Sequence, residues 1–304
     1  MFRLPPGPLL HAGGVDPTGW LWSDWNIEPT IAIGLLALLT GYLYLTRQPA
    51  DASAATRPVS GRQRAAFIGG IVTLAIALGP PLDDWSDHYL LMAHMVQHLL
   101  LILLAAPLLL TGTPAWMLEP LTRNRITNAI GYGLTRPVVA YTIANAAMVL
   151  WHLPLLYEMA LRSQPLHSLE HMTFLVTAML GWWPIAGPLP QWPRLPLALH
   201  SLYLFAMTIP GSAVGAFITF AEPGLYAPYD TARRIFGIDL ATDQQWGGLL
   251  MWVVVSTIYL VLITVSFFRW AAREENADSA EAPPARPVVG PPAVTAKSDA
   301  PAVG

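Results

Sequence analysis

The sequence predicts an all-α, polytopic membrane protein with seven transmembrane helices. More than half of the 304 residues are apolar. Only 12% are charged, whereas a soluble domain carries about 25%. Seven apolar runs are long enough, at about 1.5 Å of rise per residue, to cross a hydrocarbon core of about 30 Å. These observations together exclude an ordinary soluble domain.

The seven runs differ in length and in how clearly they end. The fourth is the shortest, because the sequence Trp151-His152-Leu153-Pro154 interrupts it early. Gly and Pro close the third and the fifth runs, and each of these two opens with a pair of histidines. We expect the spans at residues 29–46, 65–80, 88–111, 137–152, 165–185, 196–219 and 246–268.

The arginines around these runs predict the orientation. With the N-terminus outside, the outer segments hold only Arg3, Arg162, Arg233 and Arg234. Basic residues accumulate on the cytoplasmic side of membrane proteins, so the topology is predicted to be N-out and C-in. The ten inner arginines are Arg47, Arg57, Arg62, Arg64, Arg123, Arg125, Arg136, Arg194, Arg269 and Arg273.

Composition divides the chain into three parts. Residues 1–28 form an outer segment whose three tryptophans are typical of a membrane interface. Residues 29–268 form the membrane domain, in which residues 220–243 make a long outer loop. Residues 269–304 are rich in Ala, Pro, Glu and Asp beyond the last span, and we expect a disordered cytoplasmic tail.

Several classes of function are excluded or disfavoured. The chain has no cysteine, which excludes disulfides and thiolate metal sites. Its formal net charge of −3 gives no indication of a nucleic-acid partner. No phosphate-binding loop or hydrolytic motif is present, and we expect that the protein is not an enzyme.

Five histidines fall in the predicted outer half of the membrane. His94 and His98 lie one helical turn apart, as do His167 and His171, so each pair lies on one face of its helix. His94 and His171 are expected at similar depth, and His167 and His152 near the outer surface. Ionisable residues in a span are costly, so the five predict a polar functional site. The alternative is that each histidine makes an ordinary hydrogen bond between helices.

The same region offers further ligands for a metal. Neutral imidazole suits copper, zinc and iron, and thioethers add a preference for Cu(I), so Met148 and Met251 are candidate soft ligands. Glu170 is expected to accept a hydrogen bond from an imidazole N–H. Asp243 is expected to cap a helix, with a smaller chance of facing the site. His11, His88 and His200 are expected to lie outside it.

Several motifs together resemble the bacterial cytochrome c oxidase assembly factor family CtaG. They are His94-x-x-x-His98 with Pro107-Leu-Leu-Leu-x-Gly112-x-Pro114, Trp151-His152-x-Pro154-x-x-Tyr157, His167-x-x-Glu170-His171, Trp182-Trp183-Pro184, and Asp243-Gln244 with Gly247-Gly248-x-x-Met251-Trp252. The resemblance covers residues 85–255. It implies a seven-span protein of the bacterial inner membrane that is needed to produce active caa3-type oxidase, through formation of its copper centres, without being a subunit of the finished enzyme.

Three functions remain open from the sequence. The first is a copper-handling assembly factor that holds Cu(I) or Cu(II) through His94, His98, His152, His167 and His171. Its partners would be oxidase subunits and a soluble copper chaperone. A copper transporter is a variant of this function, with His200 as the only indication of an inner exit. The second is a metal-free scaffold that docks oxidase subunits or the chaperone. The third is a b-type heme electron carrier with His98 and His171 as axial ligands.

Overall fold

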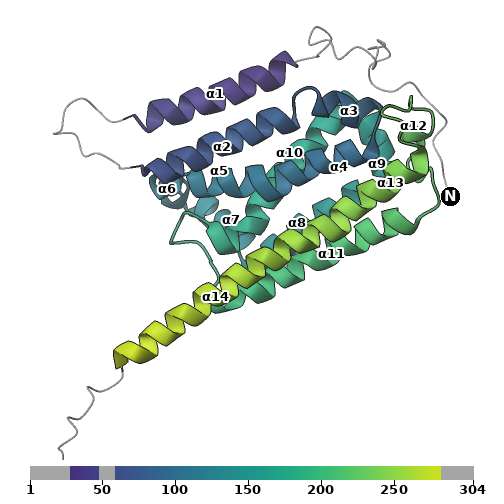
Figure 1. Ribbon diagram of the computed structural model, residues 1–304. Helices are drawn as coiled ribbons and strands as arrows, with labels where there is room; N and C mark the ends of the chain where they lie inside the picture. Colours follow the sequence, from purple (N-terminus) through teal and green to yellow (C-terminus); the bar gives the residue numbers. More distant parts are fainter. Residues whose placement is uncertain (1–27, 48–58, 282–304) are drawn as a thin grey trace, which may run out of the picture.

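The computed structural model describes residues 28–47 and 59–281, and every regular element within these ranges is helical (Figure 1). The predictions for the outer tryptophans, for Arg57 and for the chain beyond Glu281 concern residues outside these ranges. Helix α14 (Val255–Glu281) continues past the predicted end of the seventh span. The first part of the predicted tail is therefore helical, and its Ala and Glu residues are good helix formers.

Each of the seven predicted runs contains a helical stretch. The first and second are α1 (Pro29–Leu45) and α2 (Gly61–Ala77). The third and seventh are each two α-helical parts joined by a short π-helix. The remaining stretches are α4 (Leu91–Leu99) with η2 (Leu100–Ala105) and α5 (Ala106–Gly112), α8 (Pro137–Trp151), α10 (Gln164–Ala186), η3 (Leu197–Leu199) with α11 (His200–Phe220), and α13 (Leu240–Leu249) with η4 (Leu250–Val254) and α14.

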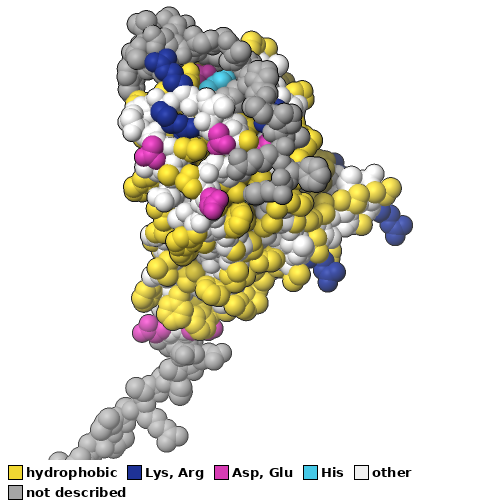
Figure 2. Space-filling view, turned by 90° about the vertical axis from the view of Figure 1, so that its right-hand side faces the viewer, with side chains coloured by type: hydrophobic (Ala, Val, Ile, Leu, Met, Phe, Trp, Pro, Cys, Tyr) yellow, Lys and Arg dark blue, Asp and Glu magenta, His cyan; other side chains and the backbone are white. Residues whose placement is uncertain are grey.

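The surface and the length of these helices are those of a membrane protein. Three stretches are long and apolar enough to cross a bilayer, namely Leu91–Gly112, Leu197–Phe220 and Leu240–Ala277, and up to five are if two bent helix pairs each count as one span. Large apolar side chains such as Val138 and Phe220 are exposed. Figure 2 shows hydrophobic side chains over most of one face, with charged ones gathered toward one end. Seven spans and their orientation remain predictions.

The starts of several helices follow from the local sequence. Ser60 and Gln63 form a reciprocal capping box at the start of α2. Asp239 accepts hydrogen bonds from the backbone N–H and hydroxyl of Thr242 at the start of α13, and these bonds lower the pKa of the Asp239 carboxyl. Proline occupies the first turn of α1, α8, α9 (Pro154–Leu161) and α10, where its missing N–H is not needed.

The π-helix η2 is explained by the proline that follows it. In a π-helix each N–H bonds the carbonyl five residues earlier, and the Ala106 N–H bonds Leu101 O in this way. Pro107 has no N–H, so the carbonyl of Ile102 loses its partner in the helix. The indole of Trp182 on α10 donates to that carbonyl at 2.8 Å. This bond joins the third and fifth stretches at the middle of the bundle.

Close helix packing brings the last stretch against α11. A Cβ atom on Gly215 would lie 2.7 Å from the backbone N of Trp252, and one on Gly248 would lie 2.6 Å from the carbonyl O of Gly215. Only glycine fits at both positions, and Gly248 belongs to the Gly247-Gly248 pair of the sequence. The helix α4 in turn packs against α13 and α3, and the ring of His98 on α4 lies 4.5 Å from that of Phe174 on α10.

Short helices close the two ends of the bundle. At one end, α3 (Leu82–His88) and α12 (Ala227–Asp230) lie close to α9 (Figure 1). The predicted outer loop contributes α12 and packs against α9. At the other end lie α6 (Ala115–Arg123) and α7 (Arg125–Leu134). The histidines predicted as a site lie beneath the first of these ends.

Candidate metal centre

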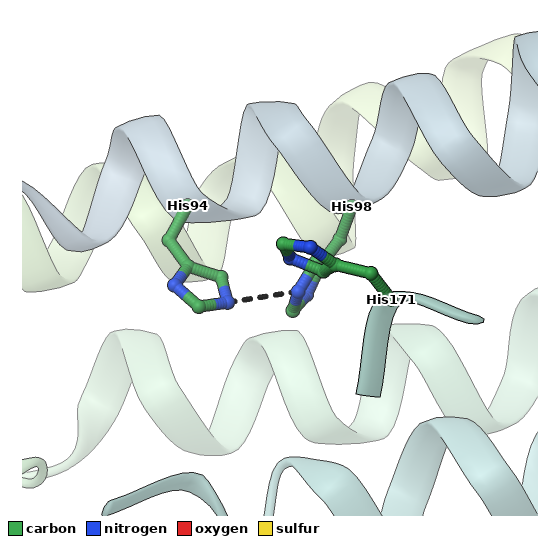
Figure 3. Close-up of side chains that lie close together, drawn as sticks. All are labelled: His94, His98 and His171. Atoms are coloured by element: carbon green, nitrogen blue, oxygen red, sulfur yellow. Dashed lines mark hydrogen bonds between the residues drawn. The ribbon is translucent and has the colours of Figure 1, made fainter. Parts of the chain in front are cut away.

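All five predicted histidines gather in one buried cluster. One ligand nitrogen from each of His94, His98 and His171 lies within 4.8 Å of the other two, and all three side chains are buried (Figure 3). Figure 3 shows His94 and His98 on one helix and His171 reaching them from another. His152, from the end of α8, lies with its ring centroid 5.8 Å from that of His98. The ring of His167 is 5.4 Å from that of His94.

The proton on His94 can be assigned by following its hydrogen bonds. The hydroxyl of Tyr229 donates its one proton to Ser86 O at 2.8 Å. It must therefore accept from the two other groups near it, Tyr157 Oη at 3.2 Å and His94 Nδ1 at 3.3 Å. His94 is thus protonated on Nδ1. Its Nε2 carries a lone pair and accepts a hydrogen bond from His98 Nε2 at 2.8 Å.

The other histidines present ring nitrogens without a partner among the described residues. His152 donates from Nδ1 to Met148 O at 2.7 Å, which leaves a lone pair on its Nε2. Buried polar atoms in proteins normally have a hydrogen-bond partner, so a cluster of exceptions requires an explanation. The unpartnered atoms here are His98 Nδ1, His152 Nε2, His167 Nε2, His171 Nε2 and both carboxylate oxygens of Glu170.

Two buried carboxylates flank the cluster. Glu170 Oε1 lies 3.8 Å from His98 Nε2, too far for the hydrogen bond to an imidazole that the sequence predicts. Asp87 comes nearer to an imidazole, since its Oδ2 lies 3.5 Å from His167 Nδ1. One ligand atom each from Asp87, His94 and His167 also lies within 4.8 Å of the others. His94 is therefore shared by two overlapping groups of possible ligands.

The geometry of the cluster fits a small ion after a modest adjustment. Bonds of about 2 Å place the nitrogens of one ion on the order of 3–4 Å apart. The 2.8 Å separation of His94 Nε2 and His98 Nε2 is shorter, so an ion would replace this hydrogen bond and push the two rings apart. The other separations among the ligand atoms of these three residues are at most 4.8 Å.

Asp243 acts at a distance from the histidines. It is fully buried, and its two carboxylate oxygens accept hydrogen bonds from the backbone N–H groups of Leu91 and Met92, each at 2.9 Å. These two groups belong to the first turn of α4, which has no side-chain cap of its own. Asp243 is therefore a helix cap, but of α4 and not of its own helix α13, whose start is capped by Asp239. It fixes the start of the helix that carries His94 and His98.

The other residues considered in the sequence analysis lie beside the histidine cluster or away from it. The side chains of Met148 and Met251 line a cavity next to His98 and His152, not the histidine cluster itself. His88 contacts Asp84 O, and His200 contacts Leu195 O at 3.1 Å. Both of these histidines lie outside the cluster, as expected.

The sequence interpretation missed three residues of the site. Asp87 lies seven residues before His94 and was not predicted as part of the site. Tyr229 and Tyr157 carry no spacing signal, because they reach His94 from α12 and α9. His152 and His167 were expected near the outer surface. They are only 5% and 2% exposed, since Tyr157, Tyr226 and Tyr229 cover the site at this end of the bundle.

The comparisons with known proteins give one match. A family model described as cytochrome c oxidase caa3 assembly factor matches residues 40–273. The chain belongs to this family. No curated protein and no solved structure shows a significant match to the chain.

The range that the caa3 assembly factor family model matches includes all five histidines of the cluster. The matched range includes the motifs on which the resemblance rests, from His94 to Trp252. The family description names an assembly role for caa3 cytochrome c oxidase, which is a role outside catalysis. The description names no metal and no ligand residue.

Proposed function

We propose that this assembly factor carries copper and delivers it to the caa3 cytochrome c oxidase. Copper is its cargo, bound by His94, His98 and His171 with His152 and His167 beside them. The observation that carries the proposal is the set of four buried imidazole nitrogens without a protein partner, gathered around the His94–His98 pair. A metal ion in the cluster would give the nitrogens that ligate it a partner, whereas a purely structural role leaves all four unexplained.

The charge of the site supports a cation. Glu170 and Asp87 are buried acidic groups at the edge of the cluster, and each lies within 4 Å of a histidine ring nitrogen. A buried cation is stable only where nearby groups offset its charge. The carboxylates offer that compensation without displacing the imidazoles as ligands.

The site also has features of a temporary holder. His94 belongs to both groups of possible ligands, so an ion can exchange between them by moving past one ring. Cysteine thiolates would bind copper more tightly, and the chain has none. Ligand exchange with histidines of an oxidase subunit, or with a soluble copper chaperone, is the transfer step we propose.

The two alternatives from the sequence are less favoured. A b-type heme held by His98 and His171 needs a flat space between the two rings. The ring of His94 lies 4.2 Å from that of His98 and 6.2 Å from that of His171, close to this space. A metal-free scaffold accounts for the family but not for the unpartnered nitrogens.

Copper binding by the purified protein tests the proposal. The detergent-solubilised protein is incubated with Cu(I) under reducing, oxygen-free conditions, and bound copper per chain is measured after desalting. We expect one copper ion at the histidine cluster, and His94→Ala with His98→Ala should abolish its binding. His200→Ala is the matched control, because His200 lies in the same bundle outside the cluster. Folded wild-type protein that binds no copper would refute the proposal.

Activity in cells separates the copper carrier from the scaffold. The scaffold predicts that His94→Ala with His98→Ala leaves caa3 oxidase activity intact, whereas the copper carrier predicts its loss. Added copper that restores activity in the variant strain would strengthen the second outcome. Equal protein levels in the membrane fraction are the control.

We further propose that the protein crosses the bacterial inner membrane seven times with its N-terminus outside. Each predicted run contains a helix, and the charged cap of α3, α9 and α12 lies at the predicted outer end. Because the chain has no cysteine, single cysteines placed at Arg233 and Arg125 can be labelled selectively. An impermeant thiol reagent should label the first in intact spheroplasts and not the second.

A further inference from the structure

A cavity lies directly beside the histidine cluster, on the side facing away from α3, α9 and α12. It contains about 70 Å³ of space for water-sized molecules and lies between the third, fourth, fifth, sixth and seventh helical stretches. His98 and His152 line it together with apolar side chains. His152, whose buried Nε2 has no partner among the described residues, therefore belongs to both the histidine cluster and the lining of this cavity.

Four thioethers face this cavity. The chain has ten methionines, and four of them line this single space from four different helical stretches. Methionine often fills gaps in apolar cores, and that role alone does not require a histidine nitrogen beside it. These four are Met95, Met148, Met207 and Met251.

The position of one sulfur atom is fixed by a hydrogen bond. The side-chain amide of Asn145 donates to Met207 Sδ at 3.4 Å and to Tyr141 O at 2.8 Å. Asn145 is itself buried and lines the cavity. A buried amide is costly in an apolar core, so its pairing with a thioether sets this cavity apart from ordinary apolar packing.

Both π-helices of the described chain border the same cavity. Ile102 and Leu103 of η2 line it, and so does Met251 of η4. Short π-helical segments inside α-helices occur frequently at functional sites, because they turn the following side chains to new directions. Here η2 begins two residues after His98, and η4 contains a cavity methionine.

We propose that this cavity, which we name the thioether cavity, is a second binding site for a soft monovalent cation, Cu(I), with His152 as the ligand it shares with the histidine cluster. This inference rests on the proposed function and specifies the oxidation state of the cargo. No carboxylate lines the cavity, so it suits a singly charged ion better than Cu(II). Thioether and imidazole donors select Cu(I) over harder ions.

The proposal implies that an ion can move between two binding sites, the thioether cavity and the histidine cluster. An ion in the thioether cavity reaches the histidine cluster by exchanging methionine sulfurs for imidazoles around His152 and His98. No electron transfer and no net loss of protons is needed in this step, because all exchanging ligands are neutral. The proton on His98 Nε2 moves to its unpartnered Nδ1 when Nε2 binds the ion. The cavity thus loads or stores the ion that the outer cluster delivers.

Counting bound Ag(I) tests the proposal, because Ag(I) resembles Cu(I) in its ligand preference and does not change oxidation state under these conditions. We expect two Ag(I) per chain in the purified wild-type protein. Met148→Leu with Met251→Leu should bind one, since leucine keeps the volume and removes the sulfur. His94→Ala with His171→Ala should also bind one, held by the cavity. Met159→Leu with Met172→Leu is the matched control, because both residues are exposed.

X-ray absorption of the Cu(I)-loaded proteins identifies the ligands independently of the count. We expect sulfur scattering in the wild type, more of it per copper in His94→Ala with His171→Ala, and none in Met148→Leu with Met251→Leu. One ion per chain, bound without sulfur and unaffected by the methionine changes, would overturn the cavity site and leave the histidine site standing. No bound ion at all in folded wild-type protein would overturn both.

Discussion

The two pairs of histidines have the same spacing and different surroundings. In each pair the ring centroids lie 4.2 Å apart. His94 and His98 are joined by a hydrogen bond between their Nε2 atoms. The hydroxyl of Tyr229 contacts the other ring nitrogen of His94, Nδ1. His167 instead faces the carboxylate of Asp87, and the Nε2 of His171 has no partner among the described residues.

This difference shows that the spacing of two histidines determines the distance between their rings, whereas other parts of the chain determine how each ring is hydrogen-bonded. One helical turn fixes the distance between two rings, because it fixes the distance between their Cβ atoms. The groups behind each ring decide which nitrogen carries the proton and which can bind an ion. For both pairs these groups come from other elements, namely α3 and α12. Four substitutions test this interpretation.

The largest effect is expected from His98→Ala. The ring of His98 neighbours those of His94, His152 and His171, so its loss removes the centre of the cluster. We expect Cu(I) affinity to fall by more than the roughly 100-fold that marks the upper range for residues behind a ligand. Competition with a chromophoric Cu(I) chelator measures this. An equal loss in His167→Ala would contradict the asymmetry between the pairs.

Tyr229→Phe should produce the next largest effect. It removes the acceptor that keeps the proton of His94 on Nδ1, while the ring remains to fill the space. A loss of about 10–100-fold in Cu(I) affinity is expected, as for other residues that orient a metal ligand. Tyr42→Phe is the matched control, because it deletes a buried hydroxyl bonded to a carbonyl far from the site. Similar losses in both variants would argue against a role for Tyr229 in orienting His94.

Asp87→Asn should weaken binding by about 10-fold, at the lower end of the range for such residues. It removes the charge beside His167 and leaves the His94–His98 pair untouched. The double variant Asp87→Asn with His167→Ala should bind copper no more weakly than His167→Ala alone, because Asp87 is expected to act only through His167. Additive losses in the double variant would show that Asp87 acts elsewhere.

Asp243→Ala should have the smallest effect on copper affinity and a clear effect on stability. It leaves the buried N–H groups of Leu91 and Met92 without acceptors. Each lost acceptor costs about 1–3 kcal/mol. Thermal unfolding of the metal-free protein should therefore begin at lower temperature, and Asp239→Ala, which alters an exposed cap, should change it less. Unchanged stability would mean that water replaces the carboxylate.

Local sequence patterns predicted the helices and the histidines, and could not predict the contacts between distant segments. Hydropathy gave the helical ranges because apolar length is a property of one segment. The pairs at 94/98 and 167/171 were visible for the same reason. The partners Asp87 and Tyr229 were not, since the contact between Tyr229 and His94 joins residues 135 positions apart.

The fold also shows the burial of His152 and His167, which their predicted depth in the membrane does not reveal. A position near a helix end indicates the interface when the loops beyond it are ignored. Here Tyr226 from the outer loop donates to the carbonyl of His152, and Tyr229 follows on α12. The loop thus covers residues that hydropathy alone places near the surface.

The bonds from Asp243 to the first turn of α4 also have a consequence for biosynthesis. The ribosome completes His94 and His98 long before it reaches Tyr229 and Asp243, which orient and anchor them. A nascent chain that has released only its first five helical stretches holds the histidines on a helix whose first turn is still uncapped. The capped start of α4 therefore forms only after the last stretch has joined the bundle.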